Sequence, residues 1–347
     1  MKIPKVTIGV LLFLDEKYLA HSLTSLLDQD YESIEYIFRD QSPNGEVYDY
    51  LLHAHPEFFH KAEIKRSKNL MHCGGHNAII REMIRHGGEY YICASNDMLY
   101  PGDFVSRIIR GMEGSEPRHY VSTCRLMQWN YEKMLAGDLE GSKTTKVDSY
   151  GIGITKGHHF YDIGQGKDEK DVEIPKKMLG PSGALAVYHK DALDAIAYRN
   201  KEGELEYFDE NMHYKGDVDL AYRLSWAGFH CYLAKDVKVY HDRQVGEKGK
   251  GNLAKLKAHH KKAAWVMADS LKGHLITLKK NFDKRFSLSV KFRTFLNNAA
   301  RFLHTLILKP KMLAVYREVS EMKEEIEKKR NSMQKNVSPP EIESIMS

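Results

Sequence analysis

The most constraining feature of the sequence is an almost uninterrupted apolar run near its start, over residues 6–14. Its length is that of a strand, and apolar side chains at successive positions predict that both faces of this strand are buried. Such strands are typical of parallel sheets that helices cover on both sides. Residues 18–27 then carry leucines at helical spacing, which predicts the first covering helix.

Strand and helix patterns continue to alternate over the first 110 residues. We expect further strands at residues 34–38, 63–66 and 90–94, helices at 47–53 and 77–86, and a glycine turn at 73–77 that leads into the second of these helices. This order predicts an α/β fold with a mainly parallel, Rossmann-like sheet and flanking helices.

The remaining chain is less regular at first and then strongly helical. We expect long loops at 137–178, strands at 180–189, 229–233 and 237–241, a helix at 217–227, and helices from 251 to about 330. The predicted division is an α/β domain at 1–247, a basic amphipathic helical extension at 248–330 and a loose tail at 331–347.

The composition limits the class of protein and its expected cellular location. Hydrophobic residues make up 42% of the 347 residues, enough for a sizeable core, and no apolar run approaches the ~20 residues of a membrane span. The N-terminal apolar run has no small-residue cleavage site after it, so we interpret it as a strand and not a signal peptide. Four scattered cysteines indicate neither a disulfide framework nor a zinc site, and we expect a cytoplasmic location.

Charge is distributed very unevenly along the chain. Residues 248–311 contain 16 Lys and Arg against two acids, whereas the rest of the chain has a net charge of −9. This predicts a mildly acidic body with a basic attachment that seeks an anionic surface.

Polar residues stand where several predicted strands end. Asp40, Asp97 and His241 follow three different strands, and Asp217 opens the helix at 217–227. Ligands of parallel sheets bind at the carboxyl ends of the strands, so we expect these side chains to converge on one edge.

Ordered motifs over residues 5–245 carry a resemblance to a known family. The opening strand–helix–strand, the segment Asn69 to Asn77, the sequence ASNDM and the segments GPSGALAVYH and YKGDVDLAYRLSWAG resemble family 2 glycosyltransferases with a GT-A fold. The segments VDSYGIG and DIGQGKDEKD are most similar to bacterial rhamnosyltransferases of cell-surface polysaccharide synthesis.

The resemblance implies a set of donor-binding residues. They are Asp40 for the base, Asn69, Gly75 and Asn77, then Asn96 and Asp97, and Ser182 with Gly183 on the floor of the sugar site. Alternatives from the residues alone are a turn-capping role for Asp40 and a plain tight turn at Ser182 and Gly183. The usual acid before Asp40 is replaced here by Arg39.

The resemblance also implies a divalent metal, Mg²⁺ or Mn²⁺, at the donor diphosphate. Asp97 corresponds to the last acid of the D-x-D motif, whose first acid is replaced by Ser95, and His241 resembles a histidine that completes the metal shell. Oxygen-rich sites suit such hard cations. The alternatives are a turn aspartate for Asp97 and a strand-end histidine for His241.

Asp217 is the expected general base of an inverting transfer, in which a carboxylate takes the proton of the attacking hydroxyl. The glutamate that usually precedes it is replaced by Gly216. Asp is also a preferred N-cap, so a capping role for Asp217 stays open.

The basic extension has three interpretations. Trp, Phe and Leu alternate there with Lys and Arg, which predicts a peripheral attachment to an anionic membrane, at the inner face of the cell membrane. A helical hairpin packed on the body is the alternative. No recognised nucleic-acid motif accompanies the charge, so nucleic acid is not an expected partner.

Together these features predict an inverting, metal-assisted glycosyltransferase. It would move a sugar, rhamnose by the closest resemblance, from a nucleoside-diphosphate donor to a glycan or lipid-linked acceptor. The alternatives are a non-catalytic nucleotide-sugar-binding relative, in view of Arg39, Ser95 and Gly216, and a basic scaffold that binds polyanions. The sequence fixes no oligomeric state.

Overall fold

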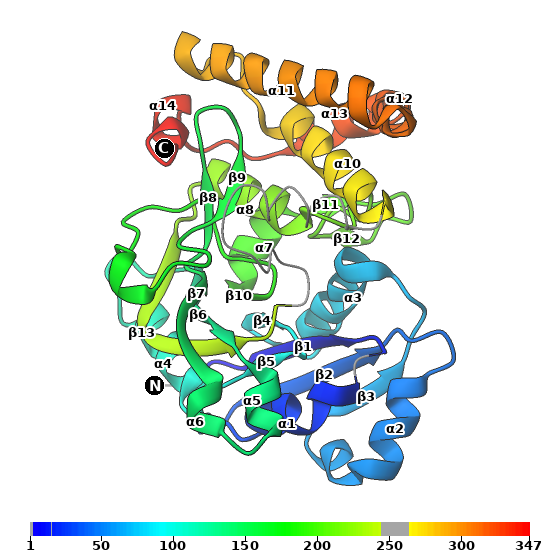
Figure 1. Cartoon of the computed structure of the whole chain (residues 1–347), viewed down its shortest axis with the longest axis vertical. Helices are drawn as coiled ribbons and strands as arrows, with labels where there is room; N and C mark the ends of the chain where they lie inside the picture. The colour runs from blue at the N-terminus through cyan, green and yellow to red at the C-terminus, as the bar shows by residue number, and fades with distance from the viewer. Residues whose placement is uncertain (1–2, 15, 244–263) are drawn as a thin grey trace.

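A nine-stranded sheet forms the centre of the protein (Figure 1). In the computed structural model, which describes residues 3–14, 16–243 and 264–347, its strands run in the order β3-β2-β1-β4-β10-β6-β13-β5, with β7 paired to β6. The strands of the chain are β1 (Val6–Leu12), β2 (Ile34–Asp40), β3 (Glu63–Arg66), β4 (Tyr90–Ala94), β5 (Met98–Leu99), β6 (Val121–Trp129), β7 (Lys143–Ser149), β8 (Ile152–Ile154), β9 (Phe160–Asp162), β10 (Leu185–His189), β11 (Tyr198–Arg199), β12 (Leu205–Glu206) and β13 (Cys231–His241).

Helices cover both faces of this sheet, as the sequence predicted. Side chains of α1, α2 and α4 pack in one buried cluster with one face of the sheet, and those of α3, α7 and α8 pack on the other. The helices are α1 (Glu16–Leu27), α2 (Glu46–Ala54), α3 (Met71–Arg85), α4 (Phe104–Glu113), α5 (Tyr131–Leu135), α6 (Leu139–Ser142), α7 (Lys190–Ile196), α8 (Gly216–Trp226), α10 (Ala264–Asn281), α11 (Leu288–Leu308), α12 (Leu313–Glu321), α13 (Lys323–Ser332) and α14 (Pro339–Glu343).

The sheet is parallel where the sequence pattern was clearest. β1 pairs in parallel with β2 and β4, β2 with β3, and β6 with β13. β10 runs antiparallel to both β4 and β6, and its first residue, Leu185, pairs with Ala94 at the carboxyl end of β4. This reversal brings the loop before β10 to the edge where the parallel strands end.

Three predicted element boundaries were wrong. The strands expected at 229–233 and 237–241 are one strand, β13, with an irregularity in its pairing between Ala234 and Lys238. The strand expected at 180–189 begins only at Leu185. The region 137–178 contains β7, β8, β9 and α6 in addition to loops, because short strands of mixed polarity lack the periodicity that identifies a strand.

The glycine turn predicted at residues 73–77 is part of helix α3, which begins at Met71. Asn69 Oδ1 accepts a hydrogen bond from the Met71 N–H at 2.8 Å and so starts the helix two residues later. A Cβ at Gly75 would meet Gln41 and Leu11, at 2.2 Å and 2.8 Å for their nearest atoms. The glycine therefore permits close packing of α3 against β1 and the turn after β2.

The tail predicted to be loose is ordered. Residues of α14 and the segment after it, Ile342 and Met346, are buried against Trp226 and Tyr222 of α8. A capping box between Ser338 and Glu341 starts α14. Pro339 occupies the first helical turn of α14, where proline is favoured, so a proline in this segment does not indicate a loose tail.

The C-terminal helices are joined to helix α8 and the segment before it by a buried network of charges. Lys280 of α10 donates to Asp219 of α8 at 2.7 Å and to Asp209, and Lys329 of α13 donates to Asp209 and Glu206 at 2.7 Å each. Burial opposes charge on Asp209, but both lysines hold the pKa of its carboxyl well below the usual range. The segment 206–219 is therefore held in place by helices that lie after residue 263.

Loss of one of these lysines should be strongly destabilising. Lys280→Met leaves Asp219 and Asp209 buried with fewer partners, and a broken buried pair costs about 3–5 kcal/mol. Urea unfolding should show this as a large loss of the free energy of unfolding.

Lys279→Met is the matched control, because Lys279 is the exposed neighbour on the same helix. We expect it to change the free energy of unfolding by less than about 0.5 kcal/mol. Equal stabilities of the two variants would show that the network does not hold the helices.

Candidate active site

Asp97 and His241 meet at the carboxyl edge of the sheet, as predicted. Asp97 lies in the turn after β4 and His241 ends β13, and Asp97 Oδ2 is 3.3 Å from His241 Nε2. The other imidazole nitrogen, Nδ1, lies 2.8 Å from Oδ2 of Asp148, a fully buried residue of β7. A carboxylate behind a histidine fixes the ring and its tautomer, and this arrangement is usual behind metal-binding histidines.

This pair fits a divalent cation that a donor diphosphate helps to hold. The 3.3 Å separation of the oxygen and nitrogen is that of two neighbouring ligands on one small ion. Burial alone lowers the pKa of His241, but Asp97 and Asp148 together raise it to about 10. In the absence of a metal, the proton on His241 therefore supplies the positive charge that the two carboxylates require.

Arg243 extends the same network, and sequence reasoning missed it. Its Nε lies 3.3 Å from Asp148, and its terminal nitrogen lies 2.8 Å from Asp162 of β9. Burial lowers the pKa of the guanidinium, but Asp162, Asp148 and, more weakly, Asp217 raise it above the usual range. Arg243 stands two residues after His241 in the sequence, and this short spacing from a strand end was the available signal.

Asp217 lies beside the loop that precedes β10. Its Oδ2 accepts a hydrogen bond from the Gly183 N–H at 2.9 Å, and its Oδ1 accepts one from the Val218 N–H at 2.9 Å. A Cβ on Gly183 would come within 3.0 Å of the Asp217 side chain, so glycine is what permits this approach. Ser182 is buried next to it, and its carbonyl accepts the Leu185 N–H.

The N-cap position of α8 is occupied by Lys215 and not by Asp217. Lys215 adopts a left-handed backbone conformation with φ 66°, which is strained for a non-glycine residue. Asp217 lies in the first turn, partly exposed. Burial and the neighbouring Arg301 lower the pKa of Lys215 to about 8, against the opposing effect of Asp217.

The structure explains the glycine in front of Asp217. A Cβ at Gly216 would lie 2.4 Å from Sγ of Cys73 on α3, so a glutamate cannot occupy this position without moving the two helices apart. Replacement of the usual acid by Gly216 thus accompanies close packing of α8 on α3.

Asp40 has the turn-capping role that was the alternative interpretation. Its two carboxylate oxygens accept the backbone N–H groups of Ser42 and Tyr48, each at 2.8 Å, and the residue is fully buried. Arg39 points to the opposite face of the sheet, as alternation along a strand requires, and pairs with Glu63 and Glu82. Its charge is therefore directed away from the turn that Asp40 forms.

The remaining predicted donor residues have different surroundings. Asn77 is fully buried, and its amide bonds to the backbone of Tyr207 and Phe208 and to Glu210, which fixes the loop before α8. Asn69 caps α3. Asn96 precedes Asp97 in the turn after β4 and is partly exposed, and the turn is tied to the β10 loop by the Ser95 N–H and the Ala184 carbonyl.

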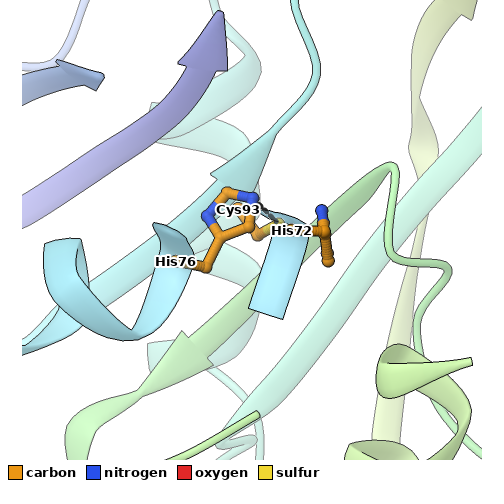
Figure 2. A group of neighbouring side chains, drawn as sticks. All are labelled: His72, His76 and Cys93. Carbon is orange, nitrogen blue, oxygen red and sulfur yellow. Dashed lines mark hydrogen bonds between the residues drawn. The ribbon is translucent and has the colours of Figure 1, made fainter. Parts of the chain in front are cut away.

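A second polar group lies next to the site, formed by His72, His76 and Cys93 (Figure 2). Their ligand-type atoms are all within 4.8 Å of one another. His76 contacts Cys93 Sγ through Nε2 at 3.2 Å and the Tyr91 hydroxyl through Nδ1. Burial lowers the pKa of His76 and raises that of the Cys93 thiol, so both are neutral, and their contacts attach α3 to β4.

The chain is similar to proteins of one known family. Residues 7–196, more than half of the chain, match the family described as "Glycosyl transferase family 2". The chain belongs to this family. No curated protein sequence is significantly similar to it.

Solved structures share the fold at low sequence identity. The crystal structure of GalNAc-T7 with UDP, GalNAc and Mn²⁺ aligns with a TM-score of 0.55 and 11% identity over 96% of this chain. The alignment spans 56% of that protein's chain, so this chain matches little more than half of its length. Staphylococcus aureus TarS with UDP aligns with a TM-score of 0.47, 13% identity and coverage of 92% of this chain and 91% of that one. The predicted GT-A fold with a helical C-terminal region is confirmed.

The charge on His241 predicts a pH dependence of stability in chelator-treated protein. The folded pKa of about 10 lies above the ordinary value of 6.5, so the protonated histidine stabilises the fold fully below about pH 6.5. This contribution should be lost as the pH rises through 10. Urea unfolding of the wild type and of His241→Gln across this range measures it.

The difference between the two proteins should be largest at pH 6 and small at pH 10.5. A matched control is His53→Gln, because His53 is exposed on α2. A difference between the wild type and His241→Gln that does not change with pH would contradict the assigned charge.

Proposed function

We propose that the protein is an inverting, metal-assisted glycosyltransferase that uses a nucleoside-diphosphate sugar. The observation that supports this best is the placement of a partly exposed carboxylate, Asp217, on the sheet edge that also carries Asp97 and His241. The complex of GalNAc-T7 with UDP, GalNAc and Mn²⁺ is consistent with this type of donor and cofactor.

Asp217 is the proposed general base. The Gly183 N–H and the Val218 N–H each bond one oxygen of its carboxylate and so orient it, while lone pairs remain to accept the proton of an acceptor hydroxyl. Removal of that proton makes the acceptor oxygen a stronger nucleophile toward the anomeric carbon. Attack opposite the leaving diphosphate inverts the anomeric configuration.

Asp97 and His241 are the proposed protein ligands of Mg²⁺ or Mn²⁺. A bound cation supplies charge neutralisation for the diphosphate as it leaves. Arg243 is a further cation at this edge, and we propose that it interacts with the same diphosphate. Its pairing with Asp148 and Asp162 fixes the guanidinium before any ligand binds.

The donor residues fall into two groups under this proposal. Asn96, Asp97, Ser182 and Gly183 lie on the two connected loops at the sheet edge and would contact the diphosphate and sugar. Asp40, Asn69, Gly75 and Asn77 would act by holding the turn after β2 and helix α3 around the base, since their side chains or packing are already engaged within the chain.

A non-catalytic, nucleotide-sugar-binding relative is the second candidate. The observation behind it is the replacement of three family acids by Arg39, Ser95 and Gly216. The ion pair of Arg39 and the close packing at Gly216 explain these two replacements. The case for a non-catalytic relative therefore rests on Ser95 alone.

The acceptor is proposed to be a glycan or lipid-linked sugar, and rhamnose is the proposed donor sugar. The proposed location is the cytoplasmic face of the cell membrane, as a peripheral protein. Among the described residues no helix is both long and apolar enough to cross a bilayer. A panel of nucleotide sugars tested for thermal stabilisation would identify the donor, since a ligand at 100 Kd adds about 2.7 kcal/mol.

Asp217→Asn tests the base. The amide keeps the size and one acceptor oxygen for the Gly183 N–H, so folding and donor binding should survive. Turnover should fall by about 10²–10⁴-fold, because the variant cannot accept the proton.

Asp236→Asn is the control, since Asp236 is exposed in β13. It should transfer sugar at the rate of the wild type. Near-normal turnover by Asp217→Asn would exclude Asp217 as the base, whereas donor binding without any wild-type turnover would favour the non-catalytic relative.

The metal site has a separate test. Two protein ligands hold a cation weakly, so Mn²⁺ should bind with low affinity alone and at least tenfold more tightly with a nucleoside diphosphate. Calorimetric titrations with and without the nucleotide measure this, and Asp97→Asn should abolish the difference. Equal affinity in both titrations, or full activity in excess chelator, would contradict the metal assignment.

A further inference from the structure

Helix α11 presents its apolar side chains outward. It lies along one end of the molecule, with α10 between it and the sheet domain (Figure 1). Leu288 is 80% exposed, Phe295 67% and Ile307 71%. The other exposed large apolar residues of this helix are Phe292, Leu296, Phe302, Leu303, Leu306 and Leu308.

The face toward the protein is mainly polar apart from the buried Val290, and hydrogen bonds fix it. The Thr294 hydroxyl bonds His158 Nδ1 at 2.7 Å, and Asn297 donates to the Gly157 carbonyl at 2.8 Å. The Thr305 side chain is also on the buried side. The helix cannot roll its apolar face inward without breaking these bonds, so outward presentation is a built feature of the fold.

Cations border the apolar face on both sides. At about 100° per residue, the apolar residues other than Leu308 occupy an arc of roughly 140°. Lys291 lies at one border of this arc, and Arg293 lies at the other. This is the pattern of a helix that lies in the plane of a membrane surface, with apolar residues in the lipid and cations at the headgroups.

The charge of residues 284–317 distinguishes between two kinds of partner for the apolar face. Residues 284–317 contain eight Lys and Arg and no acidic residue. A second copy of this chain docked through the same face would bring these cations together, whereas an anionic lipid surface neutralises them. We propose that the outer face of α11 is the surface by which the protein docks on anionic membranes.

This inference deepens the proposed function, because it names the surface that would bring the active site to a lipid-linked acceptor. α10 connects the two: Gly273 of α10 packs directly on the backbone of Tyr214, three residues before Asp217. Within the basic region expected at 248–311, the proposed membrane contact is α11. Residues 248–263 of that region lie outside the described residues.

The test is co-sedimentation of the full chain with vesicles of phosphatidylcholine alone or mixed with phosphatidylglycerol. We expect binding to the mixed vesicles at low salt, at least tenfold weaker binding at high salt, and little binding to phosphatidylcholine alone. Absence of binding to the mixed vesicles at low salt would overturn the proposal.

Two variants locate the contact. Phe292→Ser combined with Phe295→Ser and Ile307→Ser should weaken binding at least tenfold. The matched control replaces exposed apolar residues elsewhere, Leu52→Ser with Leu135→Ser, and should bind as the wild type does. Equal losses in the two proteins would overturn the assignment to α11.

The cationic border has its own pair of variants. Lys291→Gln with Arg293→Gln should weaken binding about tenfold or more and reduce its salt dependence. Lys65→Gln with Arg85→Gln, which removes exposed cations from the catalytic domain, should leave binding unchanged. Light scattering tests whether the same face instead mediates self-association of the protein. A dimer that the three serine substitutions abolish would overturn the proposal.

Transfer to a soluble acceptor analogue separates this inference from the proposed function. The serine variant should retain that transfer, because α11 contributes no residue to the proposed site. Vesicle binding without any transfer by the wild type would refute the function and leave the docking surface standing. Transfer without vesicle binding would refute the docking surface alone.

Discussion

The buried pairing of Lys280 and Lys329 with Asp209, Asp219 and Glu206 is the constraint on which the position of the segment 206–219 depends. Charges removed from water are costly unless each has close partners, and here each lysine contacts two carboxylates. Arg223 adds a third cation, bonded to Asp219 at 2.9 Å. The arrangement can form only when α8, α10 and α13 are all in place.

That dependence determines how Asp217 is presented. Asp219 is anchored two residues further along α8, and Lys215 adopts its strained conformation two residues before Asp217. Strain at one position persists only when surrounding structure fixes it, and the buried charges supply that rigidity. The proposed base, Asp217, is thus oriented from both sides, by Gly183 before β10 and by the C-terminal helices. The packed-hairpin alternative for the extension describes α10 and α13, whereas α11 keeps the exposed apolar face of the membrane interpretation.

The sequence was most informative where one physical cause dominated. Long apolar strands and leucine-rich helices predicted the parallel half, because burial on both faces leaves a clear pattern. The convergence of Asp97 and His241 followed from strand direction alone. The fixation of His241 by Asp148 could not be predicted, since β7 pairs in an irregular register with β6 and its residues alternate poorly. Gly75 was predicted to be a donor-binding residue, and its packing against Gln41, 34 positions away, could not be predicted from the sequence.

Two parts of the C-terminal region depart from the usual pattern of exposed charges and buried apolar side chains. Lys280 is buried because two carboxylates compensate its charge, and Phe295 is exposed although burial would stabilise it. A single soluble domain gains nothing from turning an apolar arc outward and bonding a polar face inward. This reversed orientation of α11 makes sense if folding and docking are separate steps. Hydrogen bonds to residues 156–158 set the orientation of the helix first, and a second surface covers its apolar arc afterwards. Rigid attachment through α10 then fixes how Asp217 faces whatever lies at that surface.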